Sequence, residues 1–130
     1  MAFVLRFVQR YRPADRQTFL ELEARSAALE ARRSDFPHGR RLQPYAGREP
    51  TNTLIWEAAF PALEAVRPAL ALIESDPEHA ELFRQQVPCF LDGYTEIHEA
   101  ISGGQRPAAA SPVAPAPGAT HEVLDFEEKP

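Results

Sequence analysis

The chain has 130 residues and a formal net charge of −5 at pH 7, and 44% of its residues are hydrophobic. This length supports one hydrophobic core and is too short for two ordinary domains. Because the net charge is negative, a phosphate-binding surface has no general electrostatic support, and we expect no nucleic-acid partner.

The sequence contains no segment typical of export or of a membrane. Arg6 interrupts the N-terminal apolar stretch, which therefore lacks the uncharged centre of a signal peptide. No apolar run approaches the ~18 residues of a membrane-spanning helix. The single cysteine, Cys89, excludes an internal disulfide, and its apolar neighbours favour a small buried side chain over a nucleophile. We expect a cytoplasmic protein without a membrane partner.

The first part of the chain predicts a strand followed by a helix. Residues 3–10 alternate in the manner of a β-strand. One face of this strand carries Phe3, Leu5 and Phe7, and the other carries Val4, Arg6, Val8 and Arg10. Pro13 and Asp15 favour a helix start, and the helix should end before Pro37. Helical spacing gives it an apolar side formed by Phe19, Leu22, Ser26 and Leu29. Glu30 falls elsewhere around the cylinder.

The remaining elements alternate between strands and helices. Three further strands are predicted at residues 40–45, 53–60 and 93–101. The first two are joined by a Gly-Arg-Glu-Pro segment typical of a hairpin loop. Residues 61–75 return to helical spacing, and Pro68 predicts a kink or a break there. Asp76 and Pro77 are typical of a new helix start, so another helix follows.

This order of elements predicts a ferredoxin-like α+β fold. Strand, helix, strand, strand, helix and strand follow one another, and both helical regions should cover one face of an antiparallel sheet. The other face would expose apolar residues such as Val4 and Val8. A second copy of the chain is the simplest cover for this face, so we expect a homodimer.

Four sequence segments together resemble a known family. They are Phe-Leu-Glu-Leu-Glu at 19–23, Pro-His-Gly-Arg-Arg at 37–41, Gly-Arg-Glu-Pro-Thr-Asn-Thr-Leu-Ile-Trp-Glu at 47–57 and Asp-Pro-Glu-His at 76–79. With the opening strand, this pattern resembles NIPSNAP-like proteins of the dimeric α+β barrel superfamily. The resemblance implies two ferredoxin-like sheets that face each other across a dimer and enclose a central cavity. It implies no single activity, because the superfamily includes haem degraders, cofactor-free monooxygenases, isomerases and members without assigned chemistry.

Neither a cofactor nor a metal is expected. The haem-degrading members of the superfamily rely on an Asn in the first strand and a His in the second helical region. The first strand here has no Asn, and Val66 stands where the His would be needed. The four histidines include no His-x-x-x-His pair of the kind that binds metal from one helix face.

The candidate catalytic residues are Tyr94, Glu96 and His98, which alternation places on one face of the last strand. The other candidates for lining the barrel cavity are Arg6 and Arg10, either Trp56 or Glu57, and either Arg41 or Tyr45. An Arg beside a Glu and a His would hold an anionic or phenolic ligand, with His98 as the general base. In the alternative interpretation, the Arg and Glu side chains only set the dimer register and bind no ligand.

The end of the chain differs in composition from the predicted domain at 1–101. Residues 102–119 are rich in Pro and Ala and predict a flexible linker. In the final segment, 120–130, acidic residues are interrupted by Val123, Leu124 and Phe126. A short apolar and acidic segment after a linker is typical of a docking peptide for a protein partner. The alternative is a solvated acidic terminus that aids solubility.

Two functional hypotheses follow. The first is a binding or interaction module, a dimeric barrel whose C-terminal segment docks on a partner or assembly. The second is a small-molecule enzyme of the cofactor-independent monooxygenase or isomerase type, with His98 as base and Arg6 as anion anchor. A solvent-open pocket that contains His98 would favour the enzyme, and a space packed shut by Trp56 and Tyr94 would favour the module.

Overall fold

The computed structural model describes residues 2–102, which form a four-stranded antiparallel sheet and three helices. The main elements are β1 (Phe3–Tyr11), α1 (Arg16–Arg32), β2 (Arg40–Leu42), β3 (Thr53–Phe60), α2 (Leu63–Ser75), α3 (Pro77–Gln86) and β4 (Phe90–Glu99). Two short 3-10 helices, Pro13–Asp15 and Val87–Cys89, precede α1 and β4. The strand order β2-β3-β1-β4 is that of a ferredoxin-like sheet, so the predicted α+β fold is confirmed.

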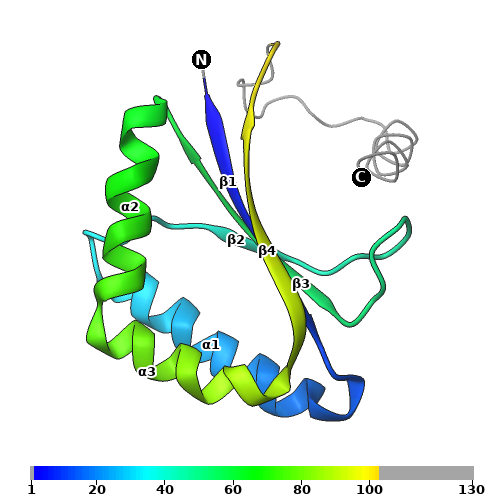
Figure 1. Ribbon diagram of the computed structural model, residues 1–130. Coiled ribbons are helices and arrows are strands. Elements are labelled where there is room, and N and C mark those ends of the chain that lie inside the picture. The colour runs from blue at the N-terminus through cyan, green and yellow to red at the C-terminus, as the bar shows by residue number, and fades with distance from the viewer. Residues whose placement is uncertain (1, 103–130) are drawn as a thin grey trace.

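All three helices lie on one side of the sheet, with α1 and α3 side by side (Figure 1). Pro68 lies inside α2 without splitting it, and α3 begins after Asp76 at Pro77, where the sequence predicted a new helix. An early Pro removes only one intrahelical hydrogen bond, whereas the Asp76 carboxylate caps α3 by accepting a hydrogen bond from the His79 backbone N–H. No helix within residues 2–102 is long and apolar enough to cross a membrane.

Two strands differ in length from the sequence prediction. β2 ends at Leu42 instead of residue 45, since Pro44 has no N–H for continued pairing with β3. β4 begins at Phe90, three residues before the predicted start, because the backbone becomes extended directly after the 3-10 turn. It ends at Glu99 instead of 101. These shifts leave the faces of the sheet as predicted.

The strand register assigns each side chain to one of two sheet faces. In β1, Arg6 is opposite Glu57 of β3 and Glu96 of β4. Residues directly opposite one another project from the same face. One face therefore meets the helices and is called the helix face, and the other, which contains Arg6, is called the open face.

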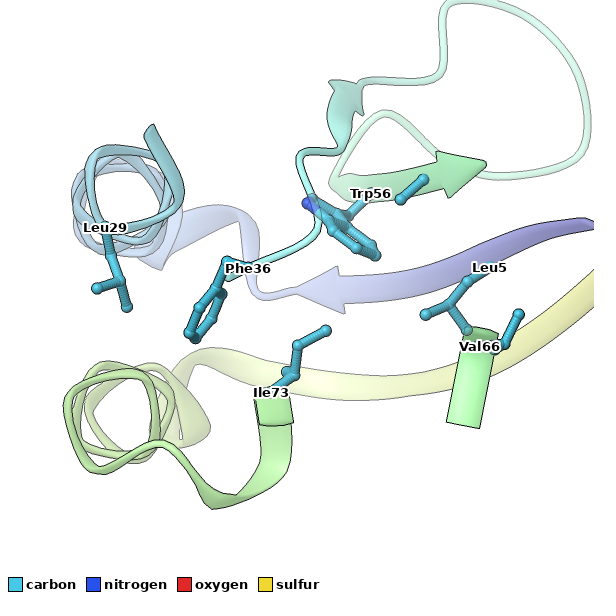
Figure 2. Close-up of a cluster of buried hydrophobic side chains, with 7 residues drawn as sticks. Leu5, Leu29, Phe36, Trp56, Val66 and Ile73 are labelled. Carbon is cyan, nitrogen blue, oxygen red and sulfur yellow. The ribbon is translucent and has the colours of Figure 1, made fainter. Parts of the chain in front are cut away.

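The hydrophobic core lies between the helix face and the helices. Its main cluster contains Leu5, Leu29, Phe36, Trp56, Ala58, Val66 and Ile73 (Figure 2). Phe36, from the loop between α1 and β2, lies between Leu29 of α1 and Ile73 of α2 in this view. The predicted apolar side of α1 is buried along its whole length. Cys89 is buried as well. Burial raises the pKa of the Cys89 thiol, which suits a packing role.

The open face is less bare than the alternation suggested. Val8 is 2% exposed and Ile55 is 8% exposed in the single chain, while Val4 is half-buried. Burial of Val8 therefore needs no second copy, and the case for a dimer depends on the rest of this face.

Candidate functional site

The predicted residues Arg6, Glu57, Glu96 and His98 meet on the open face. Arg6 Nε lies 3.1 Å from Glu57 Oε2, and Arg6 Nη1 lies 3.8 Å from Glu96 Oε1. Glu96 Oε1 is also 3.0 Å from His98 Nε2. Arg40 adds a second cation beside Glu57, at 3.2 Å. These groups form a chain of polar contacts across all four strands of the sheet.

Arg10 and Tyr94 form a second polar group on this face, joined through Glu49 of the loop between β2 and β3. Arg10 Nη2 lies 3.6 Å from Glu49 Oε1, and Arg10 Nε lies 3.3 Å from Asp92. The Tyr94 hydroxyl donates a hydrogen bond of 2.8 Å to Glu49. Burial and this carboxylate neighbour raise the pKa of Tyr94 to about 12, so Tyr94 is a hydrogen-bond donor and not a base at neutral pH.

Trp56, Arg41 and Tyr45 do not join this group. Trp56 pairs directly with Arg41 across β2 and β3, and both project from the helix face because Glu57 and Arg40 occupy the open face. Tyr45 lies in the loop after β2 with 97% of its side chain exposed. Of the predicted alternatives, Glu57 and not Trp56 therefore lies beside Arg6, and neither Arg41 nor Tyr45 does.

A cavity of about 560 Å³ lies instead between the helix face and helices α1 and α3. Its aromatic lining consists of Phe7, Phe36, Trp56, Phe83 and Phe90. Its polar lining includes Glu23, Ser26, Glu30, Arg41, His79 and Gln86. Of the predicted catalytic residues, only Tyr94 contributes to the wall, while His98 and Glu96 lie on the far side of the sheet.

Arg41 binds two buried carboxylates in this cavity. Arg41 Nε donates to Glu23 at 2.7 Å, and Arg41 Nη2 donates to Glu30 at 2.7 Å. Trp56 Nε1 donates to Glu30 at 3.1 Å, and Gln86 Nε2 donates to Glu23 at 3.0 Å. Burial lowers the pKa of Arg41, but the hydrogen bonds and charges of Glu30 and Glu23 outweigh it and leave this pKa raised. Arg41 therefore stays charged.

Trp56 is held on both sides. Its indole stacks on Phe7, with ring centroids 5.0 Å apart and an interplanar angle of 18°. Gly39 also lies so close to the Trp56 ring that a Cβ at this position would be 2.3 Å from the indole Cε2. Glycine at this position lets the loop before β2 pack against the ring. Phe7 and Gly39 therefore both pack against the indole that forms this part of the cavity wall.

His79 reaches the cavity from the first turn of α3. It is half-buried beside Phe36, with ring centroids 6.1 Å apart. Burial lowers the pKa of His79, while the carboxylates of Glu23 and Glu30 oppose this effect. The imidazole is therefore neutral at neutral pH. No hydrogen bond between the described residues involves its ring nitrogens.

No group of three or more His, Cys, Asp or Glu side chains arranged for a metal occurs within residues 2–102. The acidic pair in the cavity is occupied by Arg41, whose guanidinium takes the position that a cation would need.

Solved structures share this fold, although no protein-family model matches the sequence and no curated protein matches it. A NIPSNAP family protein from Agrobacterium tumefaciens is 14% identical at a TM-score of 0.63, over 84% of this chain and 100% of that chain. This is the fold of the NIPSNAP proteins. A putative antibiotic biosynthesis monooxygenase from Nitrosomonas europaea is 12% identical at a TM-score of 0.60, over 83% and 94%. SnoaB, a cofactor-independent oxygenase from Streptomyces nogalater, is 24% identical at 0.51, over 81% and 96%.

The segments that carry the NIPSNAP resemblance supply much of the cavity. Glu23, Arg41, Trp56 and His79 each come from a different one of the four segments, and all four line it. The sequence prediction treated these four residues separately and placed Glu30 away from the apolar side of α1. The missed signal was the spacing of Glu23, Ser26 and Glu30, which puts two acids on the buried face of α1.

Proposed function

We propose that this protein is a small-molecule enzyme that binds a neutral, flat and largely apolar substrate in the cavity between the helices and the sheet. The observation that carries the proposal is the cavity itself. Its volume of about 560 Å³ is in the ordinary range of ligand pockets. Its lining combines several aromatic rings with a few polar groups. Such a lining favours an aromatic ligand.

The charge of the lining argues against an anionic substrate. The carboxylates of Glu23, Glu30 and Glu74 stand against a single cation of the lining, Arg41. Arg41 is already bound to two of these carboxylates, so it has no unsatisfied charge to offer a carboxylate or phosphate. A neutral ligand that can donate hydrogen bonds fits this lining better.

The solved structures with this fold do not by themselves decide between an enzyme and an interaction module. They include a protein described as a cofactor-independent oxygenase and proteins described only as NIPSNAP. Because the likeness concerns the fold, support for an activity comes from the cavity and its neutral histidine. For this reason we place the enzyme hypothesis ahead of the interaction module, and move the site from the open face to the helix face.

Binding can be followed through Trp56, the single tryptophan of the chain, which lines the cavity. Nitroaromatic compounds quench indole fluorescence, so para-nitroanisole should quench Trp56 saturably. Ser26→Phe fills part of the cavity from α1 and should weaken this binding at least about tenfold, or ~1.4 kcal/mol. Ala28→Phe, on the exposed side of the same helix, is the matched control and should bind like wild type. Equal binding by both variants would exclude the cavity as the site.

The open face is proposed to meet a second copy of the chain. Ala59 is exposed there opposite half-buried Val4, and Tyr94 is exposed opposite Val8. Ala59→Arg would put a bulky charge into this interface, whereas Ala71→Arg changes an exposed position on α2. Light scattering should report a dimer for wild type and Ala71→Arg, and mainly a monomer for Ala59→Arg. A monomeric wild type would contradict the proposal.

The docking hypothesis for Val123, Leu124 and Phe126 concerns residues that lie outside the described part of the chain, 2–102. It remains a proposal that rests on composition. Partner proteins captured by the full chain should be lost when residues 120–130 are deleted, and an unchanged set of partners would refute it.

A further inference from the structure

Of the cavity's titratable groups that are not exposed to solvent, one can accept a proton without first losing a partner among residues 2–102. Glu23 and Glu30 both bind Arg41, and Gln86 and Trp56 donate hydrogen bonds to them as well. His79 differs, because its ring makes no hydrogen bond within residues 2–102 although it lines the same cavity. An imidazole with a free lone pair in an aromatic pocket is placed to act on a bound substrate.

We propose that His79 is the general base of this cavity, and that its substrate carries an acidic hydroxyl of the phenol or enol type. The proposal rests on the function proposed above, since it assigns the chemistry of the same cavity. Within it, Arg41 is a positioning residue that holds the carboxylates of Glu23 and Glu30 in place. Both carboxylates lie on α1, across the cavity from the helix that carries His79.

The proton transfer balances without any other reactant. The substrate O–H bond breaks, an N–H bond forms on the His79 ring, and the electron pair stays on the substrate oxygen. Before the transfer, Glu23, Glu30 and Arg41 together carry one net negative charge. After it, this charge faces an imidazolium and stabilises it. The net negative charge of the cavity thus stabilises the protonated histidine, although the same charge disfavours ligands that bind as anions.

Other charges near His79 act in both directions. Asp76, which caps α3, favours the imidazolium, whereas Arg41 and the N-terminal end of the α3 dipole disfavour it. The base therefore rests in its neutral form at neutral pH, ready to accept a proton from a bound substrate. His98 is not equivalent, because it pairs with Glu96 on the opposite face of the sheet.

The two histidines make a matched test. Para-nitrophenol absorbs visible light only as its anion, and para-nitroanisole is the same ligand without the proton. Somewhat below the pKa of free para-nitrophenol, wild type and His98→Gln should convert the bound phenol to its coloured anion. His79→Gln should bind both ligands but hold at least about tenfold less anion, which corresponds to one pKa unit.

The outcomes separate the two proposals. If para-nitroanisole fails to quench Trp56 in wild type, the cavity does not bind aromatic ligands and the proposed function fails. If both ligands bind but the anion is absent from wild type, or equal in His79→Gln, only the assignment of His79 is overturned. Loss of the anion in His98→Gln would overturn it too. Binding of para-nitroanisole by His79→Gln serves as the control for folding.

Discussion

Replacing Arg41 by alanine removes the cation that Glu23 and Glu30 share, and it should be among the most destabilising single substitutions in the chain. Arg41 donates three hydrogen bonds to these carboxylates, at 2.7, 2.7 and 3.3 Å. Both glutamates are 8% exposed. Removing one partner of a buried ion pair costs roughly 3–5 kcal/mol, because the remaining charge stays desolvated.

The lower end of that range applies here. The Arg41 side chain is 20% exposed, so water can reach part of the site after the substitution. We expect a loss of about 3 kcal/mol in the free energy of unfolding. The neighbouring Arg40 is the control, because its side chain is 71% exposed and binds Glu57 on the open face. Arg40→Ala should cost less than ~1 kcal/mol, as surface ion pairs do.

Urea denaturation followed by circular dichroism, at neutral pH and one protein concentration, measures both losses. A further variant combining Arg41→Met with Glu23→Gln and Glu30→Gln removes all three charges. It should recover more than half of the stability lost in Arg41→Ala, because no uncompensated charge remains. Equal losses for Arg40→Ala and Arg41→Ala would refute the reasoning, since the two residues would then sit in equivalent surroundings.

Three further outcomes follow from the packing. Gly39→Ala should cost about 1–3 kcal/mol and shift the fluorescence of Trp56, because its Cβ would overlap the indole; an unchanged spectrum and midpoint would contradict the contact. Asp76→Ala should cost about 1 kcal/mol at neutral pH through loss of the α3 cap. The hydrogen bond from the His79 backbone N–H and the guanidinium of Arg33 lower the pKa of Asp76. The stabilisation that Asp76 provides is therefore present above the ordinary aspartate pKa and is lost as pH falls through the lowered pKa. The gap between wild type and Asp76→Ala should therefore close in acid, and a gap independent of pH would refute this. Cys89 should react with a thiol reagent only after unfolding, because burial raises its pKa, and rapid labelling of the native protein would contradict its burial.

Local patterns were sufficient for the elements and for the two faces of β1. Strict alternation from Phe3 to Arg10 separates the side chains that meet the helices from those that do not, whatever the partner strands are. The spacing of Phe19, Leu22, Ser26 and Leu29 likewise predicts the buried side of α1. The order of these elements then predicted the ferredoxin-like arrangement, which the solved structures share.

The location of the site required the tertiary structure. Alternation within β2 and β3 leaves open whether Arg40 or Arg41, and Trp56 or Glu57, faces the helices, because a shift of one residue exchanges the two faces. Only the pairing of Arg41 with Trp56 against the helices decides it.

The same holds for the groups around that pair. Glu30 was expected away from the apolar side of α1, since a carboxylate is stable in a core only when a cation reaches it, and that cation, Arg41, comes from strand β2. His79 reaches the cavity because the helical region breaks at Asp76 and α3 then runs beside α1. Sequence alone thus determined the elements and the buried sides of β1 and α1, but not the residues of the cavity. Their convergence depends on contacts between residues far apart in the chain, which only the folded structure specifies.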